Sequence, residues 1–180
     1  CTSTSCGPAF ANSVSQGTVY GTTLLDELAE AYRHGVVDAS GLLQGDAFEH
    51  GIRKDDIVIT QDTVRQIQLA KAAIRTGIEL AAYELRLPLQ EISQVYLAGG
   101  FGFYMNPESA YCLELLPEEF RGKLQIAGNT SLKGAVLALT EPERMLELPE
   151  NMKNSRVMDL SLNKNFQEFF VHRLSFSPNH

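Results

Sequence analysis

Three glycines within four residues, directly after a short apolar run, constrain the fold of this chain more than any other feature. The run Val95–Ala98 predicts a buried strand, and Gly99, Gly100 and Gly102 follow it. Residues 106–108 (Asn-Pro-Glu) then supply a capping side chain, a first-turn proline and an acid, which together predict a helix start. This order places bare backbone at the carboxyl end of a strand, where open α/β sheets bind ligands.

The glycines themselves have two interpretations. Glycine accepts positive φ and allows a flat ligand to approach the backbone closely, so Gly99–Gly102 is a candidate ligand loop. A tight strand-to-helix turn needs glycine for its geometry alone. The spacing does not choose between the two.

Composition narrows the class of protein. The 180 residues are enough for one well-buried domain or for two small lobes that share a core. Hydrophobic residues make up 44% and charged residues 21%, as in ordinary globular proteins, and the net charge of −7 argues against binding to nucleic acid or anionic membranes. Apolar runs stay far below the roughly 20 residues of a membrane helix. We therefore expect a cytoplasmic protein with neither nucleic acid nor membrane as a partner.

The cysteines do not predict a metal site. Cys1, Cys6 and Cys112 form no Cys-x-x-Cys pair, and no histidine lies at ligand spacing from them. We expect free thiols, and neither a bound metal nor an iron–sulfur cluster within this chain.

A long helix over about residues 61–86 is the second informative element. The expected apolar stripe consists of Val64, Ile67, Ile74, Ile78, Ala81 and Leu85. Lys71 occupies a position on this stripe, and Gln68 and Arg75 share its side of the helix. A buried ammonium group is costly unless it is paired or reaches a polar cavity. Alternatively, the stem packs and the charge reaches solvent.

The rest of the chain alternates strands and helices, which predicts an α/β fold with a mixed, largely parallel sheet flanked by helices. The expected elements are a loop at 1–21, a helix at 22–33, an irregular stretch at 36–56, a strand at 57–59, a helix at 106–115, a strand at 124–127, helices at 131–139 and 141–147, a strand at 156–160 and a final helix capped by Asn163.

Two glycine-containing strand ends, residues 99–102 and 128–131, are expected at one edge of this sheet. A flat ligand such as adenine would lie on the Gly99–Gly100 backbone, with Gln68 and Lys71 hydrogen-bonded to its sugar. The chain contains neither Gly-x-x-x-x-Gly-Lys-Ser/Thr nor Gly-x-Gly-x-x-Gly, and no nucleophile with a supporting base. We therefore expect no catalytic residue here.

Several segments, in order and spacing, resemble the C-terminal part of the ATP-dependent reductive activators of corrinoid proteins. The matching segments are residues 1–10, 24–30, 35–38, 59–62, 68–77, 96–102, 108–110, 115–117 and 128–132. These activators belong to the acetate-kinase, sugar-kinase, heat-shock-chaperone and actin superfamily. The resemblance implies a single actin-like, ribonuclease H-like ATPase lobe over residues 1–180, with a smaller helical and loop subdomain at about 22–90 and a sheet core in the remainder.

The resemblance also assigns site residues. The glycine turn resembles the adenosine motif of the superfamily, and the helix around Lys71 resembles the one that contacts ribose and adenine in chaperone ATPases. Asn129 is a weaker candidate, because Gly128-Asn129 is also typical of a plain turn. The implied nucleotide-binding residues are Gly99, Gly100, Phe101, Gly102, Gln68, Lys71, Arg75 and Asn129.

In complete family members, the resemblance implies that ATP binding and hydrolysis drive an electron from an iron–sulfur cluster to Co(II) corrinoid on a methyltransferase partner, which gives Co(I). The ferredoxin-like domain for that cluster and the phosphate loops for Mg²⁺ and ATP match nothing in this sequence. We therefore expect this chain to bind ATP or ADP without catalysing hydrolysis alone. The alternative is a non-catalytic interaction module that docks a corrinoid protein, a missing ATPase half or, as a homodimer, a second copy.

Overall fold

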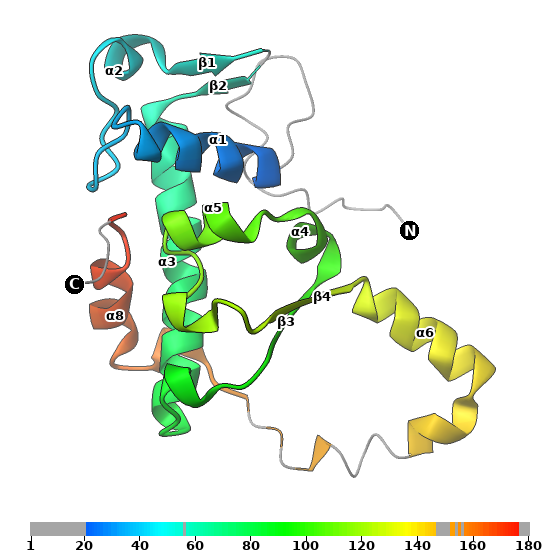
Figure 1. The fold of residues 1–180 in the computed structure, drawn as a ribbon. Helices are drawn as coiled ribbons and strands as arrows, with labels where there is room; N and C mark the ends of the chain where they lie inside the picture. The colour runs from blue at the N-terminus through cyan, green and yellow to red at the C-terminus, as the bar shows by residue number, and fades with distance from the viewer. Residues whose placement is uncertain (1–20, 56, 147–151, 154, 156, 177–180) are drawn as a thin grey trace, which may run out of the picture.

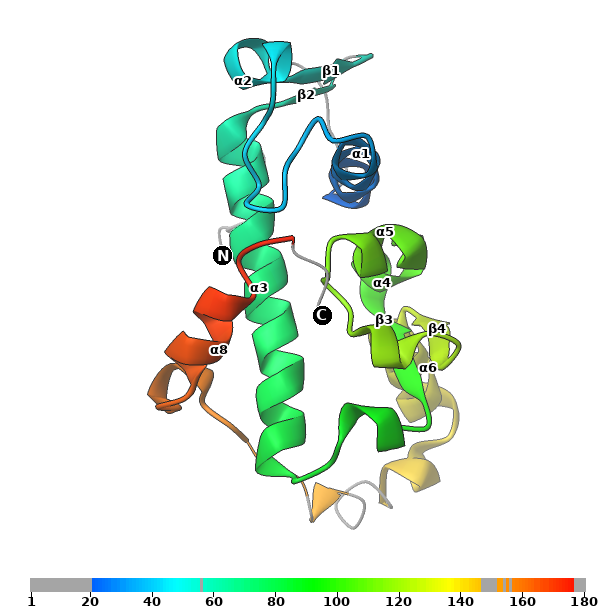
Figure 2. The same ribbon diagram turned by 60° about the vertical axis from the view of Figure 1, so that its left-hand side comes forward.

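One long helix organises the molecule, which is known here from a computed structural model that describes residues 21–55, 57–146, 152–153, 155 and 157–176. Helix α3 (Gln61–Glu84) runs along the body, and Figure 1 shows α1, α5 and α8 beside it and α6 away from it. Helix α8 lies on one side of α3, and α4, α5 and the β3–β4 sheet lie on the other (Figure 2). Residues 1–20 of the expected loop at 1–21 lie outside the described residues, and Gly21 is the first residue of helix α1 instead of a loop residue.

The described elements follow an alternating order. They are α1 (Gly21–Arg33), α2 (Asp46–His50), β1 (Ile52–Lys54), β2 (Ile57–Ile59), α3, η2 (Leu89–Glu91), β3 (Val95–Ala98), α4 (Gly99–Tyr104), α5 (Pro107–Cys112), η3 (Glu118–Phe120), β4 (Leu124–Gly128), α6 (Thr130–Thr140), η4 (Pro142–Leu146), η5 (Leu160–Leu162) and α8 (Phe166–His172). Helices, including short 3₁₀ turns, dominate the described residues, and the strands form two separate pairs, one antiparallel and one parallel.

The stretch at 36–56 is more regular than the sequence suggests. It contains α2 and β1, and β1 pairs antiparallel with β2. The loop before α2 is organised by Asp38, whose Oδ1 accepts hydrogen bonds from the backbone N–H groups of Ser40 at 2.8 Å and Leu42 at 3.0 Å. The expectation of an irregular stretch was wrong because β1 becomes a strand only through pairing with β2.

Helix α3 begins as predicted and ends two residues earlier, at Glu84. Thr60 is the N-cap, and its Oγ1 accepts a hydrogen bond from the Thr63 N–H at 3.3 Å. The predicted apolar stripe is only partly buried, since Ile74 is 44% and Leu85 67% exposed. The helix is covered from two sides, so its buried residues include a polar group: Thr63, Gln68, Lys71, Arg75, Thr76 and Glu79.

Strand β3 leads directly into α4, so the predicted glycine turn forms the start of a helix. The expectation that β3 is buried was wrong, because Tyr96 is 60% exposed on a sheet that has only β3 and β4 among the described residues. β3 and β4 are parallel, with an irregularity between Leu97 and Ala98. The predicted cap of the next helix is confirmed: Asn106 Oδ1 accepts from the Glu108 N–H at 3.0 Å.

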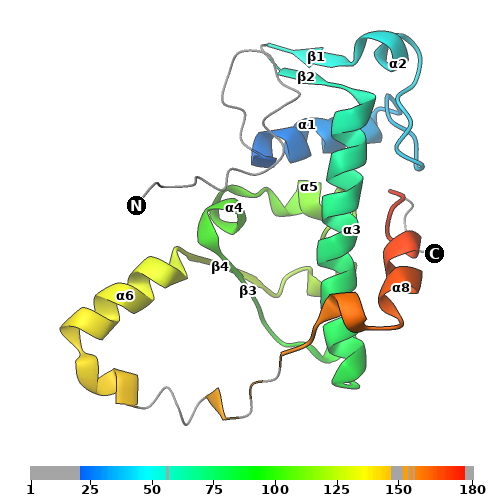
Figure 3. The ribbon, with the colours of Figure 1, turned by 180° about the vertical axis from the view of Figure 1, so that it is seen from behind.

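The helix predicted after Gly128 is confirmed as α6, which projects away from the body (Figure 3). Two later expectations were wrong. Residues 157–159 form no strand, and η5 follows them. The Asn163 side chain accepts from the Asn165 N–H at 2.9 Å, and α8 begins only at Phe166. A strand needs a partner for its backbone groups, and the described residues offer none beside this segment.

The hydrophobic core lies where α1, α3, α5 and the end of the described chain meet. Its fully or almost fully buried members include Leu24, Leu25, Leu28, Val64, Ile67, Leu113, Leu116, Phe120 and Phe176. Phe176 lies four residues after α8 and is 0% exposed, so the C-terminal segment is an integral part of the core.

Candidate functional site

An apolar cavity of about 240 Å³ lies between α1, α3 and α4. Lys71 from α3 and Phe101 from α4 both line it, so the two parts of the predicted site meet there. Its remaining lining residues were not predicted as ligand contacts, although Ile67 and Ile74 belong to the expected apolar stripe; they are Gly21, Leu24, Leu25, Ile67, Ala70, Ile74 and Leu115. The unusual exposure of Ile74, at 44%, reflects its place on this cavity wall.

The three glycines before and within α4 differ in what surrounds them. A Cβ atom added to Gly99 or Gly100 would meet nothing within 4 Å, so the backbone there faces open space. Gly99 also has a φ of 82°, which favours glycine. A Cβ on Gly102 would lie 3.2 Å from Leu97 Cβ and 3.3 Å from the Leu97 carbonyl carbon. The first two glycines leave room for a ligand, whereas Gly102 allows α4 to pack on β3.

Lys71 is completely buried, so its ammonium group does not reach solvent. Its Nζ donates a hydrogen bond to the Ser175 carbonyl and lies 5.2 Å from the centre of the Phe176 ring. Burial lowers the pKa of Lys71 to about 8, and the Glu114 carboxylate partly opposes this shift. The stem of Lys71 therefore faces the cavity while its charge is held by the C-terminal segment.

Gln68 and Arg75 lie on the buried side of α3 with Lys71, as predicted. Both form hydrogen bonds with other groups of this protein. Gln68 Nε2 donates to the carbonyls of Ser40 at 2.8 Å and Leu174 at 2.9 Å. Arg75 Nε donates to Glu79 Oε1 at 2.6 Å. Neither residue lines the apolar cavity. In this conformation Gln68 anchors the segment that ends at Phe176 and the loop at 38–44, and Arg75 pairs with Glu79, which also contacts Arg173.

Asn129 has a local role at the start of α6. Its Oδ1 accepts a hydrogen bond from the Leu132 N–H at 2.9 Å, which caps the helix. Gly128, with a φ of 71°, precedes it at the end of β4. Asn129 is not among the residues that line the apolar cavity.

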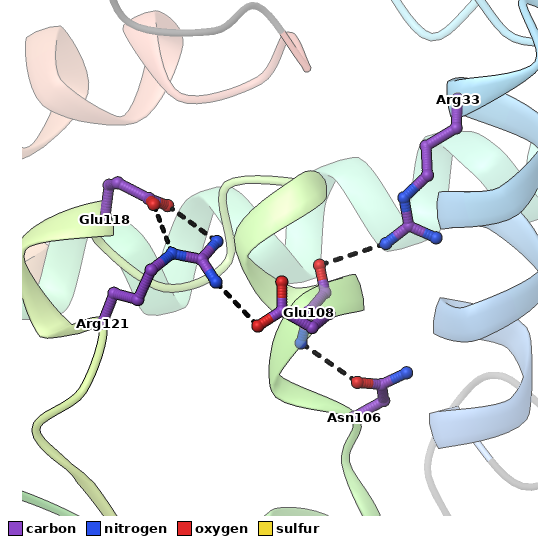
Figure 4. Close-up of polar contacts among 5 residues, drawn as sticks. All are labelled: Arg33, Asn106, Glu108, Glu118 and Arg121. Atoms are coloured by element: carbon purple, nitrogen blue, oxygen red, sulfur yellow. Dashed lines mark hydrogen bonds and ion pairs between the residues drawn. The ribbon is translucent and has the colours of Figure 1, made fainter.

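A second hollow, of about 460 Å³, lies beside α5 and is lined by Arg75, a predicted site residue, together with charged groups that were not predicted, among them Arg33 and Arg121. Figure 4 shows its ion-pair network: Arg121 contacts Glu108 and Glu118, and Arg33 Nη2 donates to the Glu108 carbonyl at 3.2 Å. The carboxylates and Arg121 are largely exposed, so these pairs contribute little to stability. Their geometry ties α1 to α5 and η3.

The part of the chain that the structure describes offers no group of three or more His, Cys, Asp or Glu residues that could hold a metal ion. Cys112 is half-buried, and its thiol contacts the Ala29 carbonyl at 3.7 Å. The described residues therefore do not fit the ligand set of an iron–sulfur cluster.

Among the described residues, no helix is both long and apolar enough to cross a bilayer.

Comparisons with known proteins agree with one another. A family model for the C-terminal domain of RACo, the ASKHA domain, matches residues 2–180. The chain is also similar to the corrinoid activation enzyme RamQ of Eubacterium limosum, with 26% identity over 184 residues, 88% of this chain and 31% of RamQ.

A solved structure, a reductive activator for corrinoid, iron-sulfur protein, superposes with a TM-score of 0.74 and 32% identity. That match covers 84% of this chain and 27% of the other. This chain thus spans less than a third of the length of either relative.

Proposed function

This chain belongs to the family of C-terminal RACo domains, which have the ASKHA fold, and from this membership we propose that it is an adenine-nucleotide-binding lobe of a corrinoid-activating ATPase. The observation that carries the proposal is the apolar cavity on which Lys71 of α3 and Phe101 of α4 meet. At about 240 Å³ it is smaller than the roughly 300 Å³ at which sites for drug-sized ligands begin. It therefore suits a single ring system such as a nucleobase.

The remaining parts of the nucleotide would lie outside the cavity, along the open backbone of Gly99 and Gly100. Phe101 and the Lys71 stem would contact the base. Gln68 and Arg75 would bond to the sugar only by exchanging their present partners, Leu174 and Glu79. Gly102 supports the site because it allows α4 to pack closely on β3. Asn129 would affect nucleotide binding indirectly, since it caps α6 and so fixes where that helix begins.

The activity of the complete protein is part of the proposal. We propose that ATP, with Mg²⁺, binds across this lobe and a second one, and that its hydrolysis drives a conformational change. One electron would then pass from a reduced iron–sulfur cluster to Co(II) corrinoid, which oxidises the cluster and gives Co(I). The cluster and the phosphate loops would belong to polypeptide beyond the residues described here. The partner would be a corrinoid protein or its methyltransferase, in the cytoplasm.

Calorimetric titration with AMP, ADP and ATP tests whether this chain binds nucleotide. We expect a dissociation constant in the micromolar to millimolar range, about −8 to −4 kcal/mol. Ala70 lines the cavity and Ala73 is exposed outside it, which gives a matched pair of variants. Ala70→Phe should fill the cavity and abolish binding, whereas Ala73→Phe should bind like the parent. Absence of heat with all three nucleotides would refute nucleotide binding by this chain.

A non-catalytic interaction module is the second candidate, and the surface of the β3–β4 sheet favours it. Tyr96 is 60% exposed on the face of the sheet that it shares with Gln125, and α6 has no buried residue. The opposite face packs partly against the core through Val95, Leu97 and Leu124, so one face of this small parallel sheet is left for a partner. This surface would dock a corrinoid protein, the remaining ATPase half or a second copy.

The oligomeric state distinguishes the second copy from the other two occupants. A dimer in light scattering that Tyr96→Lys converts to a monomer would support self-association through this sheet. A monomer for both proteins would exclude the homodimer and leave docking of another polypeptide.

A further inference from the structure

The walls of the apolar cavity carry almost no groups that form hydrogen bonds. Of the nine lining residues within the described part of the chain, eight are Gly, Ala, Leu, Ile or Phe, and Lys71 is the ninth. Carbon atoms therefore make up nearly all of the surface that an inserted ring would touch. A ring edge with donors and acceptors would find apolar side chains opposite it.

Lys71 does not change this chemistry, because its polar atom is already engaged elsewhere. Its Nζ donates to the Ser175 carbonyl and lies over the Phe176 ring, and the whole side chain is 0% exposed. The amide side chain of Gln68, one turn earlier on α3, donates its Nε2 hydrogen bonds to the Ser40 and Leu174 carbonyls. The polar groups of α3 thus face the C-terminal segment, and the methyl groups of Ile67, Ala70 and Ile74 face the cavity.

From this arrangement we infer that the site accepts purine nucleotides with little discrimination between bases. The inference rests on the proposed function, and it specifies the ligand class of the same cavity. The base is held by apolar contact with its ring, and its exocyclic groups are directed to the open rim. Adenine, guanine and unsubstituted purine all present such a ring.

The expected selectivity follows from how apolar pockets discriminate. A site built to hydrogen-bond a polar group rejects an analogue that lacks it by about 10⁴-fold or more. An apolar pocket separates ligands of similar shape by only about 10- to 200-fold. We therefore expect the dissociation constants of AMP, GMP and purine riboside monophosphate to lie within about 100-fold of one another.

Titration of the intact chain with these three monophosphates and with ribose 5-phosphate tests the inference. Ribose 5-phosphate has no base and should bind at least about 10-fold more weakly than AMP, because it leaves the cavity empty. Ile74→Ala should weaken the binding of AMP and GMP by the same factor. Ile74 would contact the ring of the base and form no hydrogen bond with its exocyclic groups. Ala73→Gly, on the exposed side of α3, is the control and should change neither affinity.

The outcomes separate this inference from the proposed function. If AMP binds and GMP binds more than about 100-fold more weakly, nucleotide binding stands and the tolerance for bases is refuted. The same holds if Ile74→Ala changes the ratio of the two affinities. If ribose 5-phosphate binds as well as AMP, the base does not occupy the cavity. If none of the ligands binds, the proposed function itself fails.

Discussion

At the scale of single residues, Lys71 is the most unusual group in the protein. It is fully buried, and its amine contacts a backbone carbonyl and an aromatic ring. Burial of a charge without complete compensation destabilises a fold, and the lowered pKa of about 8 expresses that cost. The sequence pattern had already identified Lys71 as out of place on an apolar stripe.

The stability of the protein should therefore rise with pH above about 8. Between the folded pKa of about 8 and the ordinary value of 10.5, the unfolded chain binds more protons than the folded one. The free energy of unfolding increases over that range, and the gain is absent below pH 8. Urea unfolding up to about pH 9, compared with the same measurement on Lys71→Met, isolates the Lys71 contribution, because the raised pKa of Cys112 and of the tyrosines opposes the gain equally in both proteins. Lys71→Met should be more stable at neutral pH and lack the slope, and a slope unchanged in Lys71→Met would contradict this explanation.

Gly102 and Gly100 form a natural pair for substitution. A methyl group on Gly102 meets rigid atoms of Leu97 at 3.2 and 3.3 Å, so Gly102→Ala should cost about 1–3 kcal/mol. Gly100→Ala meets nothing within 4 Å and should change stability by less than about 0.5 kcal/mol. The proposed ligand contact predicts the opposite order for AMP affinity. Gly100→Ala should reduce the affinity more than Gly102→Ala does. Thermal unfolding and calorimetry of both variants would measure the two orders.

At the scale of elements, the C-terminal segment 173–176 functions as a core element without being a helix or strand. The Phe176 N–H donates to the Ala39 carbonyl at 2.7 Å, and its ring lies 5.7 Å from that of Tyr32. Gln68 and Lys71 hold the two preceding carbonyls. The segment thereby connects α3 to α1 and to the loop before α2.

Phe176→Ala should consequently destabilise the protein by about 3–5 kcal/mol, as expected for loss of a buried aromatic ring. Phe48→Ala is the control, because Phe48 is 59% exposed on α2 and should cost less than about 0.5 kcal/mol. Denaturant unfolding measures both changes in the free energy of unfolding, provided that the dependence on denaturant concentration (the m value) is the same for both variants and the parent. Equal costs for the two variants would show that the segment is dispensable.

At the scale of the whole molecule, burial is unevenly distributed. Helix α3 is covered from two sides. Strands β3 and β4 each carry an exposed large side chain, Tyr96 and Ile126, and α6 projects from the body (Figure 3). Amide hydrogen exchange should therefore be slowest in the middle of α3 and much faster in β3, β4 and α6. A partner that docks on the sheet should slow exchange in β3 and β4 selectively, and protection of these strands in the free protein equal to that of α3 would contradict this view.

Much of the fold could be predicted from local sequence. The start of α3 at Thr60, the cap at Asn106 and the start of α6 after Asn129 were all recognisable, because each depends on a side chain and a backbone group a few residues apart. The resemblance to the corrinoid activators is confirmed by the family match over residues 2–180. Strand β1 and the absence of a strand at 157–159 were not predicted, because pairing depends on distant partners.

The candidate site shows the same division. The sequence by itself determined which residues are special, since glycines after a strand and a lysine on an apolar stripe are local signals. Only the tertiary structure decided where their side chains go. In the folded protein Gln68 bonds to the C-terminal segment and Arg75 to Glu79. Ile67, Ala70 and Ile74 line the cavity instead. A helix has several faces, and the elements packed against it, distant in sequence, determine which face binds a ligand and which one supports the fold.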